Sequence, residues 1–510
     1  MASGEPKMVI ATNERILILL LCGVAALRVF IFSAGFPFFS NIDEDLHFDL
    51  IIQYSHGQPA GSFDRLKDET LNWIVPYASP EFLFPPEHFP DGKFPAPLWK
   101  QAWSNIEPEI ASTRAAWSSE INFESSQPPL YYGVAGSWWW IGKGLGLVGI
   151  GALYWIRFLN VALIAIVVWL GYVTALAIAP ERLELRIGVP LLLAFVPQNV
   201  FYAMNNDVLS PLCFGMLFLC VLQWLRTNTP SLLLGAVTGG VIALTYLTKL
   251  SNLPLIFVAS VIILAKLGAI VRRMPRAGLI ALAALVFCAA FPIGSWIVWM
   301  KLHFGDLTGS TGKITFLDWT RKPFTEWWQH PIFTAGGLRV FWSDLMARFW
   351  RGEVEWHGRQ FDWKAADQLY AVSSLVFIAA AVAGLRKSSG LSSFQRQVIA
   401  VAILTVAAGI AFLGLLSIQF DFGSCVNPSR SHPYFTSGRL LSGMIIPFAL
   451  TYVYGIACFC RLVVPRLEQT RWMGTAATLV LLGAIVSYSQ ITEIFVTQPV
   501  FASEHNWFHR

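Results

Sequence analysis

Residues 41–50 place four carboxylates and a histidine within ten positions, shortly after an apolar run long enough to span a membrane. These residues are Asp43, Glu44, Asp45, His47 and Asp49. A carboxylate in such a segment can take the proton from an attacking hydroxyl group, and a nearby histidine can orient it or bind a substrate. Asp43 is our candidate for a catalytic base, and Glu44 is the second candidate.

The same segment has a helical pattern of apolar residues, with Leu46, Leu50 and Ile51 in one band. The pattern predicts a short amphipathic helix lying on the membrane, with Asp43 at its N-cap. His47 then lies one turn after Asp43, so the two side chains can share a pocket. The alternative interpretation is structural: Asp43 only caps the helix, and the other acidic side chains are solvated.

The composition of the 510-residue chain indicates which elements position these groups. Hydrophobic residues make up 55% of the chain and charged residues 13%, and the mean hydropathy is +0.55. Such a chain cannot form ordinary soluble domains, so we predict an all-α membrane protein. The net charge of +5 does not indicate nucleic acid binding. The seven cysteines lack metal-ligand spacing, and we predict no cofactor; a divalent cation at Asp43 and Glu44 is the less favoured alternative.

Eleven apolar runs are long enough to cross a hydrocarbon core of about 30 Å. They cover residues 16–34, 150–178, 187–204, 208–225, 231–248, 252–271, 277–300, 367–385, 397–418, 438–461 and 472–491. If the amino terminus is cytoplasmic, five short basic links between these runs all fall inside. We therefore predict about 11 transmembrane helices in the inner (plasma) membrane, a cytoplasmic amino terminus and an extracytoplasmic carboxyl terminus.

A further apolar segment, residues 130–146, contains three consecutive tryptophans. A crossing there would turn the later basic links outward, so we predict a short interfacial or re-entrant helix, with a tilted span as the alternative. Two large extracytoplasmic loops then follow, residues 35–149 and 301–366. Up to Glu124 the first loop carries fourteen acidic residues against five Lys or Arg, which marks the outer face as the working face.

Other polar residues occur where predicted spans end on that face. Asn206 and Asp207 interrupt two apolar runs, although Asn and Asp are also ordinary turn residues. Lys249 lies at the outer end of a span, where it either extends its amino group to the headgroups or binds a lipid phosphate. Arg439 lies at the hydrocarbon boundary, where a guanidinium group needs an anionic partner. Acidic and basic groups therefore face one another at the membrane surface.

In this order the motifs resemble those of the polytopic GT-C glycosyltransferases, and most closely an uncharacterised bacterial branch with a DE-x-x-H signature. The motifs are Asp43, Glu44 and His47, the box Gln127-Pro128-Pro129-Leu130-Tyr131-Tyr132, the turn Pro197…Asn206-Asp207, Thr248-Lys249 and Gly438-Arg439. The resemblance extends from Asp43 to Pro447. Relatives often carry Gln-Gly-Arg-Tyr where this chain has Ser437-Gly438-Arg439-Leu440.

The resemblance implies a GT-C-like bundle, a polyprenyl-phosphate sugar as donor, and transfer to a glycan, lipid or protein acceptor outside the cytoplasm. The residues fit this chemistry, because Asp43 can deprotonate a sugar hydroxyl while Arg439 and Lys249 stabilise the leaving phosphate. The candidate substrate-binding residues are His47, Gln127, Tyr131, Asn206, Asp207, Lys249, His432, Tyr434 and Arg439. Residues 1–300 form the predicted N-terminal catalytic module, 301–366 the second loop and 367–510 the C-terminal membrane module.

The alternative function is a transporter or flippase of a lipid-linked sugar. Such proteins usually show internal repeats and charges near the bilayer midplane, whereas the polar residues here lie at span ends. A metal-dependent hydrolase using Asp43, Glu44 and His47 lacks a second ligand cluster. The segment around Gly312-Lys313 resembles a phosphate-binding loop, but it lacks the required first glycine and the Ser/Thr after the lysine.

Overall fold

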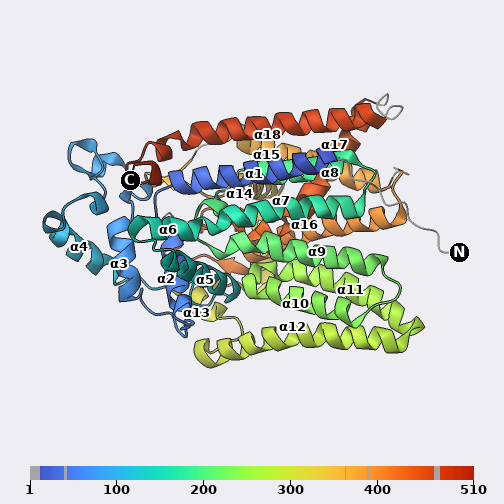
Figure 1. Ribbon diagram of the computed structural model, residues 1–510, viewed down its shortest axis with the longest axis horizontal. Helices are drawn as coiled ribbons and strands as arrows, with labels where there is room; N and C mark the ends of the chain where they lie inside the picture. The colour runs from blue at the N-terminus through green and yellow to red at the C-terminus, as the bar shows by residue number, and fades with distance from the viewer. Residues whose placement is uncertain (1–11, 40–42, 362, 387–389, 465–470, 510) are drawn as a thin grey trace.

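The computed structural model describes residues 12–39, 43–361, 363–386, 390–464 and 471–509. Its long helices run side by side in a bundle, and shorter helices cover one end of it (Figure 1). The helices of the bundle are α1 (Thr12–Gly35), α6 (Gly149–Arg157), α7 (Leu159–Ile178), α8 (Leu183–Phe195), α9 (Ser210–Arg226), α10 (Leu232–Thr248), α11 (Leu253–Arg273), α12 (Pro275–Phe304), α15 (Lys364–Arg386), α16 (Ser393–Gln419), α17 (Ile445–Val463) and α18 (Arg471–Phe501).

The end that carries the shorter helices is called the loop end. The shorter helices are α2 (Glu44–Ser55), α3 (Asp68–Tyr77), α4 (Trp103–Trp117), α5 (Leu130–Gly144) and α13 (Ser310–Phe316). Helix α14 (Ala335–Arg351) packs against α15 of the bundle. Helices α2, α3, α4, α5 and α13 lie at the left of Figure 1, where the chain also ends. Helix α1 starts at the opposite end of the bundle and reaches the loop end at Gly35.

Nine helical segments among the described residues are long and apolar enough to cross a membrane. They correspond to nine of the eleven predicted spans. The other two predicted spans, 187–204 and 231–248, form shorter helices, α8 with 13 residues and α10 with 17 residues. A multi-pass helical membrane protein is therefore confirmed.

The predicted span 187–204 is wrong in its second half, because α8 ends at Phe195. Pro197 follows two residues later and cannot continue a helical hydrogen-bond ladder. The last carbonyl groups of α8 would be left without partners. Arg28 of α1 donates to one of them and to the carbonyl of the C-cap residue, with Nε 3.2 Å from the Ala194 oxygen and Nη2 2.8 Å from the Val196 oxygen.

Helix α2 confirms the predicted helix in the acidic segment, but its predicted surface position is wrong. The side chains of Leu46, Phe48 and Ile51 are at most 2% exposed, and the helix packs against α5. Close packing is possible at Gly136 of α5, where a Cβ atom would lie 2.9 Å from the backbone nitrogen of Ser55. The α2–α5 pair thus forms a buried platform at the loop end.

Helix α5 corresponds to the apolar segment 130–146 and has 15 residues. At about 1.5 Å per residue it is about 22 Å long, too short for a hydrocarbon core of about 30 Å. The ring of Trp138 in α5 stacks on the ring of Trp155 in α6, with ring centroids 4.4 Å apart. These features agree with the prediction of a short helix rather than a full span.

Among its described residues, the structure contains two small strand pairs, of which one joins distant segments and the other is a local hairpin. Strand β1 (Thr320–Arg321) pairs antiparallel with β4 (Phe420–Asp421), which directly follows α16. Strands β2 (Glu355–Trp356) and β3 (Arg359–Gln360) form a hairpin. The first pair holds the segment 305–334 next to the chain that leads to α17.

Candidate active site

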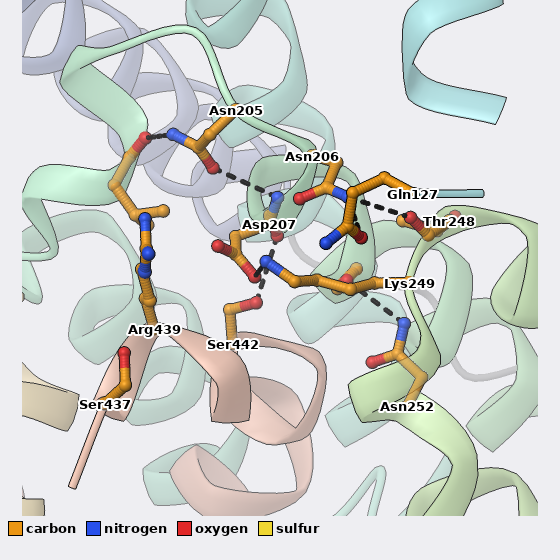
Figure 2. Close-up of polar contacts among 12 residues, drawn as sticks. Gln127, Asn205, Asn206, Asp207, Thr248, Lys249, Asn252, Ser437, Arg439 and Ser442 are labelled. Atoms are coloured by element: carbon orange, nitrogen blue, oxygen red, sulfur yellow. Dashed lines mark hydrogen bonds and ion pairs between the residues drawn. The ribbon is translucent and has the colours of Figure 1, made fainter. Parts of the chain in front are cut away.

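The candidate site lies at the loop end, where segments far apart in the sequence converge. It is built from the start of α2, the 3₁₀ segment Asn206–Leu209 before α9, the end of α10, and the 3₁₀ segment Gly438–Met444 before α17. Figure 2 shows the side chains of the last three segments pointing toward one another. Three ion pairs organise this cluster.

The first ion pair joins Asp43 and Arg439. Arg439 Nη2 lies 2.7 Å from Asp43 Oδ2, and the two side chains are 18% and 23% exposed for Arg439 and Asp43 respectively. A solute can therefore approach this pair from outside the protein. The segment that carries Arg439 packs closely against the backbone of α14. This packing depends on Gly438, where a Cβ atom would lie 2.1 Å from the backbone nitrogen of Phe349.

The predicted capping role of Asp43 is wrong. Asp43 occupies the N-cap position of α2, but its side chain makes no capping hydrogen bond. Its backbone has φ 57° and ψ 29°, in the left-handed region that residues other than glycine rarely adopt. Such conformations persist where the surrounding structure enforces them, and they are frequent at functional sites. Here the conformation directs the carboxylate at Arg439 instead of at the helix.

Glu44 points away from Asp43 into the protein. It is 0% exposed and forms an ion pair with Arg157, which is also 0% exposed, through Nε at 2.6 Å and Nη2 at 2.5 Å. Its two oxygens also accept hydrogen bonds from the backbone N–H groups of Phe39 and Met204, each at 2.9 Å. A carboxylate held in this way has a structural function, so the structure gives no support to Glu44 as an alternative base.

The second ion pair, Asp207 with Lys249, lies deeper. The distance between Lys249 Nζ and Asp207 Oδ1 is 2.6 Å, and the side chains are 8% and 0% exposed for Lys249 and Asp207 respectively (Figure 2). Asn205 caps the short 3₁₀ segment by accepting the Asp207 N–H at 3.0 Å, as expected for turn chemistry. Ser442 donates to the backbone oxygen of Asp207 at 3.0 Å. This pair therefore connects the α9, α10 and α17 segments.

The third ion pair joins Glu124 of the first loop to Lys313 of α13. The distance between Lys313 Nζ and Glu124 Oε1 is 2.6 Å. Although burial acts in the opposite direction, the positive charges of Lys313 and Lys249 hold the pKa of Glu124 well below its usual range. Gln127 donates to Glu124 and accepts a hydrogen bond from Asn206 at 3.0 Å. A continuous polar chain thus extends from Lys313 to the Asn206 segment.

His47 is buried, and only its backbone N–H bonds to Asp43, donating to the Asp43 carbonyl oxygen at 3.0 Å. Its Nδ1 lies 2.8 Å from the hydroxyl of Tyr132, and it is 1% exposed. Burial lowers the pKa of His47 to about 4, so the imidazole is neutral at neutral pH. Tyr131 is also buried, and in the described chain its hydroxyl has no hydrogen-bond partner.

Asp45, in the first turn of α2, has an unusual charge state. Burial, with the negative charges of Asp43 and Glu120, raises the pKa of Asp45 to about 8. At neutral pH this carboxyl group is mostly protonated and can donate a hydrogen bond. The first loop therefore presents a charged and a neutral carboxyl group two residues apart.

The predicted site residues His432 and Tyr434 form a neighbouring cluster. His432 Nε2 lies 2.8 Å from Asp344 Oδ2, and the His432 and Tyr434 rings have centroids 5.0 Å apart. His330 stacks edge-on against Tyr434 and bonds to the Pro433 oxygen at 3.0 Å. Among the described contacts, neither predicted residue reaches the three ion pairs.

Sequence reasoning missed several residues of the site. Arg157 was visible as a charge inside an apolar run, which by itself indicates a buried partner. Glu124 and Lys313 had no such signal, because both lie in polar loops. Within the described residues, no three His, Cys, Asp or Glu side chains are placed to hold a metal ion.

The fold and the site define a multi-pass helical membrane protein with paired charges clustered at one end of its bundle. The chain belongs to the family described as "Predicted membrane protein (DUF2142)", whose profile matches residues 27–421. No curated protein sequence matches the chain.

Two solved structures have similar helical arrangements. One is the oligosaccharyltransferase of Archaeoglobus fulgidus, in complex with Zn and sulfate, with 12% identity and a TM-score of 0.40 over 93% of this chain and 52% of that chain. The other is ArnT from Cupriavidus metallidurans bound to undecaprenyl phosphate, with 12% identity and a TM-score of 0.41 over 97% of this chain and 78% of that chain. The chain spans about half the length of the oligosaccharyltransferase.

Proposed function

We propose that the protein is an inverting membrane glycosyltransferase of the GT-C type. It moves a sugar from a polyprenyl-phosphate carrier to a glycan, lipid or protein acceptor on the extracytoplasmic side. The observation that carries this proposal is the partly exposed pair of Asp43 and Arg439, which joins a base and a phosphate-binding group at the loop end. We place the loop end outside the cytoplasm.

In the reaction, an acceptor hydroxyl oxygen forms a bond to the anomeric carbon as the bond from that carbon to the phosphate oxygen breaks. Asp43 takes the hydroxyl proton, and the carrier phosphate leaves with the bonding electron pair. Arg439 stabilises the charge that develops on the phosphate, because a guanidinium group can bind two phosphate oxygens at once. Binding of the phosphate draws Arg439 away from Asp43 and leaves the carboxylate available for the proton.

The deeper residues position the substrate in this proposal. Asn206 Oδ1 and Asp207 Oδ2 are buried and accept no hydrogen bond within the described chain, so they can accept bonds from sugar hydroxyls when the site opens. Lys249 is held by Asp207 and stabilises this arrangement. His47 and Gln127 orient the surrounding groups, while Tyr131, His432 and Tyr434 are assigned to more peripheral substrate contacts.

The test is a transfer assay with purified protein in detergent, supplied with labelled polyprenyl-phosphate sugars and membrane-derived acceptors. The expected result is a labelled acceptor and free polyprenyl phosphate. Detergent removes the second compartment, so transport cannot produce this signal. A folded protein that binds the lipid but yields no product with any sugar would favour a flippase and overturn the proposal.

A further inference from the structure

A cavity of about 480 Å³ lies within the layer of loops, separate from the three ion pairs. Its walls come from the end of α3, the segment 79–98, one face of α4, and the carboxyl-terminal tail. The lining includes Phe84, Phe89, Thr113, Trp117, Glu120 and His505. The volume falls within the range of roughly 300–1,000 Å³ that is typical of small-molecule sites.

The lining of this cavity, called the outer-loop cavity, combines aromatic rings with carboxylates. Phe84, Phe89 and Trp117 offer flat apolar surfaces, and Glu109 and Glu120 offer hydrogen-bond acceptors. No lysine or arginine occurs among its described lining residues. Aromatic rings pack against the apolar faces of sugar rings, and carboxylates bind sugar hydroxyls or ammonium groups. An acidic ligand would meet the like charges of Glu109 and Glu120.

The outer-loop cavity adjoins the segment that carries Asp43. Its wall residue Ala78 forms a β-bridge with Phe38, and the neighbouring Ser79 donates its N–H to the Phe38 oxygen at 3.4 Å. On another wall, Glu120 acts electrostatically on Asp45, which also senses the charge of Asp43. The cavity wall is therefore joined to the chain shortly before the proposed base, through the bridge between Ala78 and Phe38.

We propose that the outer-loop cavity is the acceptor subsite, and that it binds a neutral or cationic glycan rather than an acidic one. The assignment rests on the proposed glycosyltransferase function. The glycan packs on the aromatic wall, and one of its hydroxyls reaches Asp43 from the cavity side. The donor phosphate occupies the Arg439 side.

Cysteine labelling tests the cavity without any donor sugar. Thr113→Cys places a thiol in the lining, and Ser112→Cys is the matched control, because Ser112 is exposed on the same helix and does not line the cavity. Both variants carry Cys425→Ser to remove a native thiol in an outer segment. Three tetrasaccharides are then tested for their ability to protect the thiol from labelling. They are built from N-acetylglucosamine (neutral), glucosamine (cationic) and galacturonic acid (anionic).

The neutral or the cationic tetrasaccharide should slow labelling at Thr113→Cys about tenfold at a concentration near nine times its Kd, and should not slow it at Ser112→Cys. The cationic reagent MTSET should also react faster than the anionic MTSES at Thr113→Cys, relative to the control. Equal or better protection by the galacturonic acid tetrasaccharide would overturn the charge assignment. If none of the three protects, the cavity is not a glycan site.

A second variant connects the cavity to transfer. Trp117→Ala should raise the acceptor KM at least about tenfold and leave the donor KM unchanged, because the aromatic wall contacts only the acceptor. A raised donor KM would place the cavity on the donor side and overturn the proposal. If wild-type protein transfers no sugar at all, the proposed function fails, and the labelling result still decides whether the cavity binds a glycan.

Discussion

Asp43 and Arg439 are 396 residues apart in the sequence and form a 2.7 Å ion pair in the partly exposed part of the candidate site. The pair joins the first loop to the start of α17, so it depends on nearly the whole fold. It also places a proton acceptor and a phosphate ligand in direct contact. The first two predictions separate these two roles.

Asp43→Asn should abolish transfer while the protein still folds and accumulates in the membrane. Asparagine tolerates the left-handed conformation at this position, but an amide cannot accept the proton. A general base contributes roughly 10²- to 10⁴-fold to the rate, so initial transfer rates should fall by that amount. Asp91→Asn is the matched control, since Asp91 is exposed in the same loop and also has a positive φ of 58°. Near-normal turnover in the Asp43 variant would exclude it as the base.

Arg439→Ala should weaken donor binding and slow the chemical step together, because the same contact strengthens as the phosphate leaves. Loss of one charge-assisted contact costs roughly 2–4 kcal/mol, or a 30- to 1,000-fold drop in rate. Arg439→Lys should restore the rate only partly, since a point charge cannot bind two phosphate oxygens in a planar fork. The measurement is the initial rate against donor concentration in detergent. The control is Arg430→Ala, nine residues earlier, where the arginine is 69% exposed; an unchanged rate in Arg439→Ala would move the phosphate site elsewhere.

Glu44→Gln should destabilise the protein, because it leaves Arg157 buried with an uncompensated charge. Breaking a buried ion pair costs about 3–5 kcal/mol. The double variant Glu44→Gln/Arg157→Met removes both charges and should be more stable than the single variant. Thermal unfolding followed by circular dichroism in detergent compares these proteins. Asp64→Asn breaks the exposed pair with Lys67 and should cost less than about 1 kcal/mol; an equal loss in both single variants would contradict the structural role of Glu44.

Asp45→Asn should change the pH dependence of stability between about pH 3.8 and pH 8. The folded protein holds this proton up to about pH 8, whereas the unfolded chain releases it near pH 3.8. Stability from this group is therefore complete below pH 3.8 and is lost progressively as the pH rises to about 8. The variant lacks this loss, so its unfolding temperature relative to wild type should rise between pH 5 and pH 9. A difference that stays constant over this range would show that Asp45 titrates normally.

His47→Gln should act in the opposite pH direction. The folded-state pKa of about 4 lies below the ordinary histidine pKa of 6.5, so the unfolded chain binds a proton first as the pH falls. Wild-type protein therefore loses stability between about pH 6.5 and pH 4, and the variant should lose less. Unfolding temperatures at pH 7, 5.5 and 4.5 measure this effect. A parallel decline in both proteins would assign the acid sensitivity to other groups.

Much of the fold was predictable because hydropathy and span length are local properties of the sequence. The end of α8 was also readable in principle, since Pro197 interrupts its apolar run. The position of α2 was not, because burial of its acidic face depends on Arg157, more than a hundred residues away. A pattern of periodic apolar residues cannot distinguish a helix on a membrane from a helix packed under loops.

The candidate site was predictable in its residue types and only partly in its pairings. Asp43 and Glu44 are neighbours in the sequence, but Asp43 has a left-handed backbone whereas Glu44 begins the helix, and the first pairs with Arg439 while the second pairs with Arg157. Neither direction can be read from the motif alone. Lys313 was set aside with its false phosphate-loop motif, and it enters the site only because α13 packs over the first loop.

The three ion pairs make anion binding at this site an exchange. Arg439, Lys249 and Lys313 each hold a carboxylate already, so an entering phosphate must replace a partner rather than occupy a bare positive charge. Chloride or inorganic phosphate has no lipid chain or sugar to offset that loss. The site should therefore bind the small anions of its surroundings weakly. Because its charges are already neutralised in pairs, it would favour a phosphate whose attached lipid chain offsets the loss of a pair, even before the sugar is recognised.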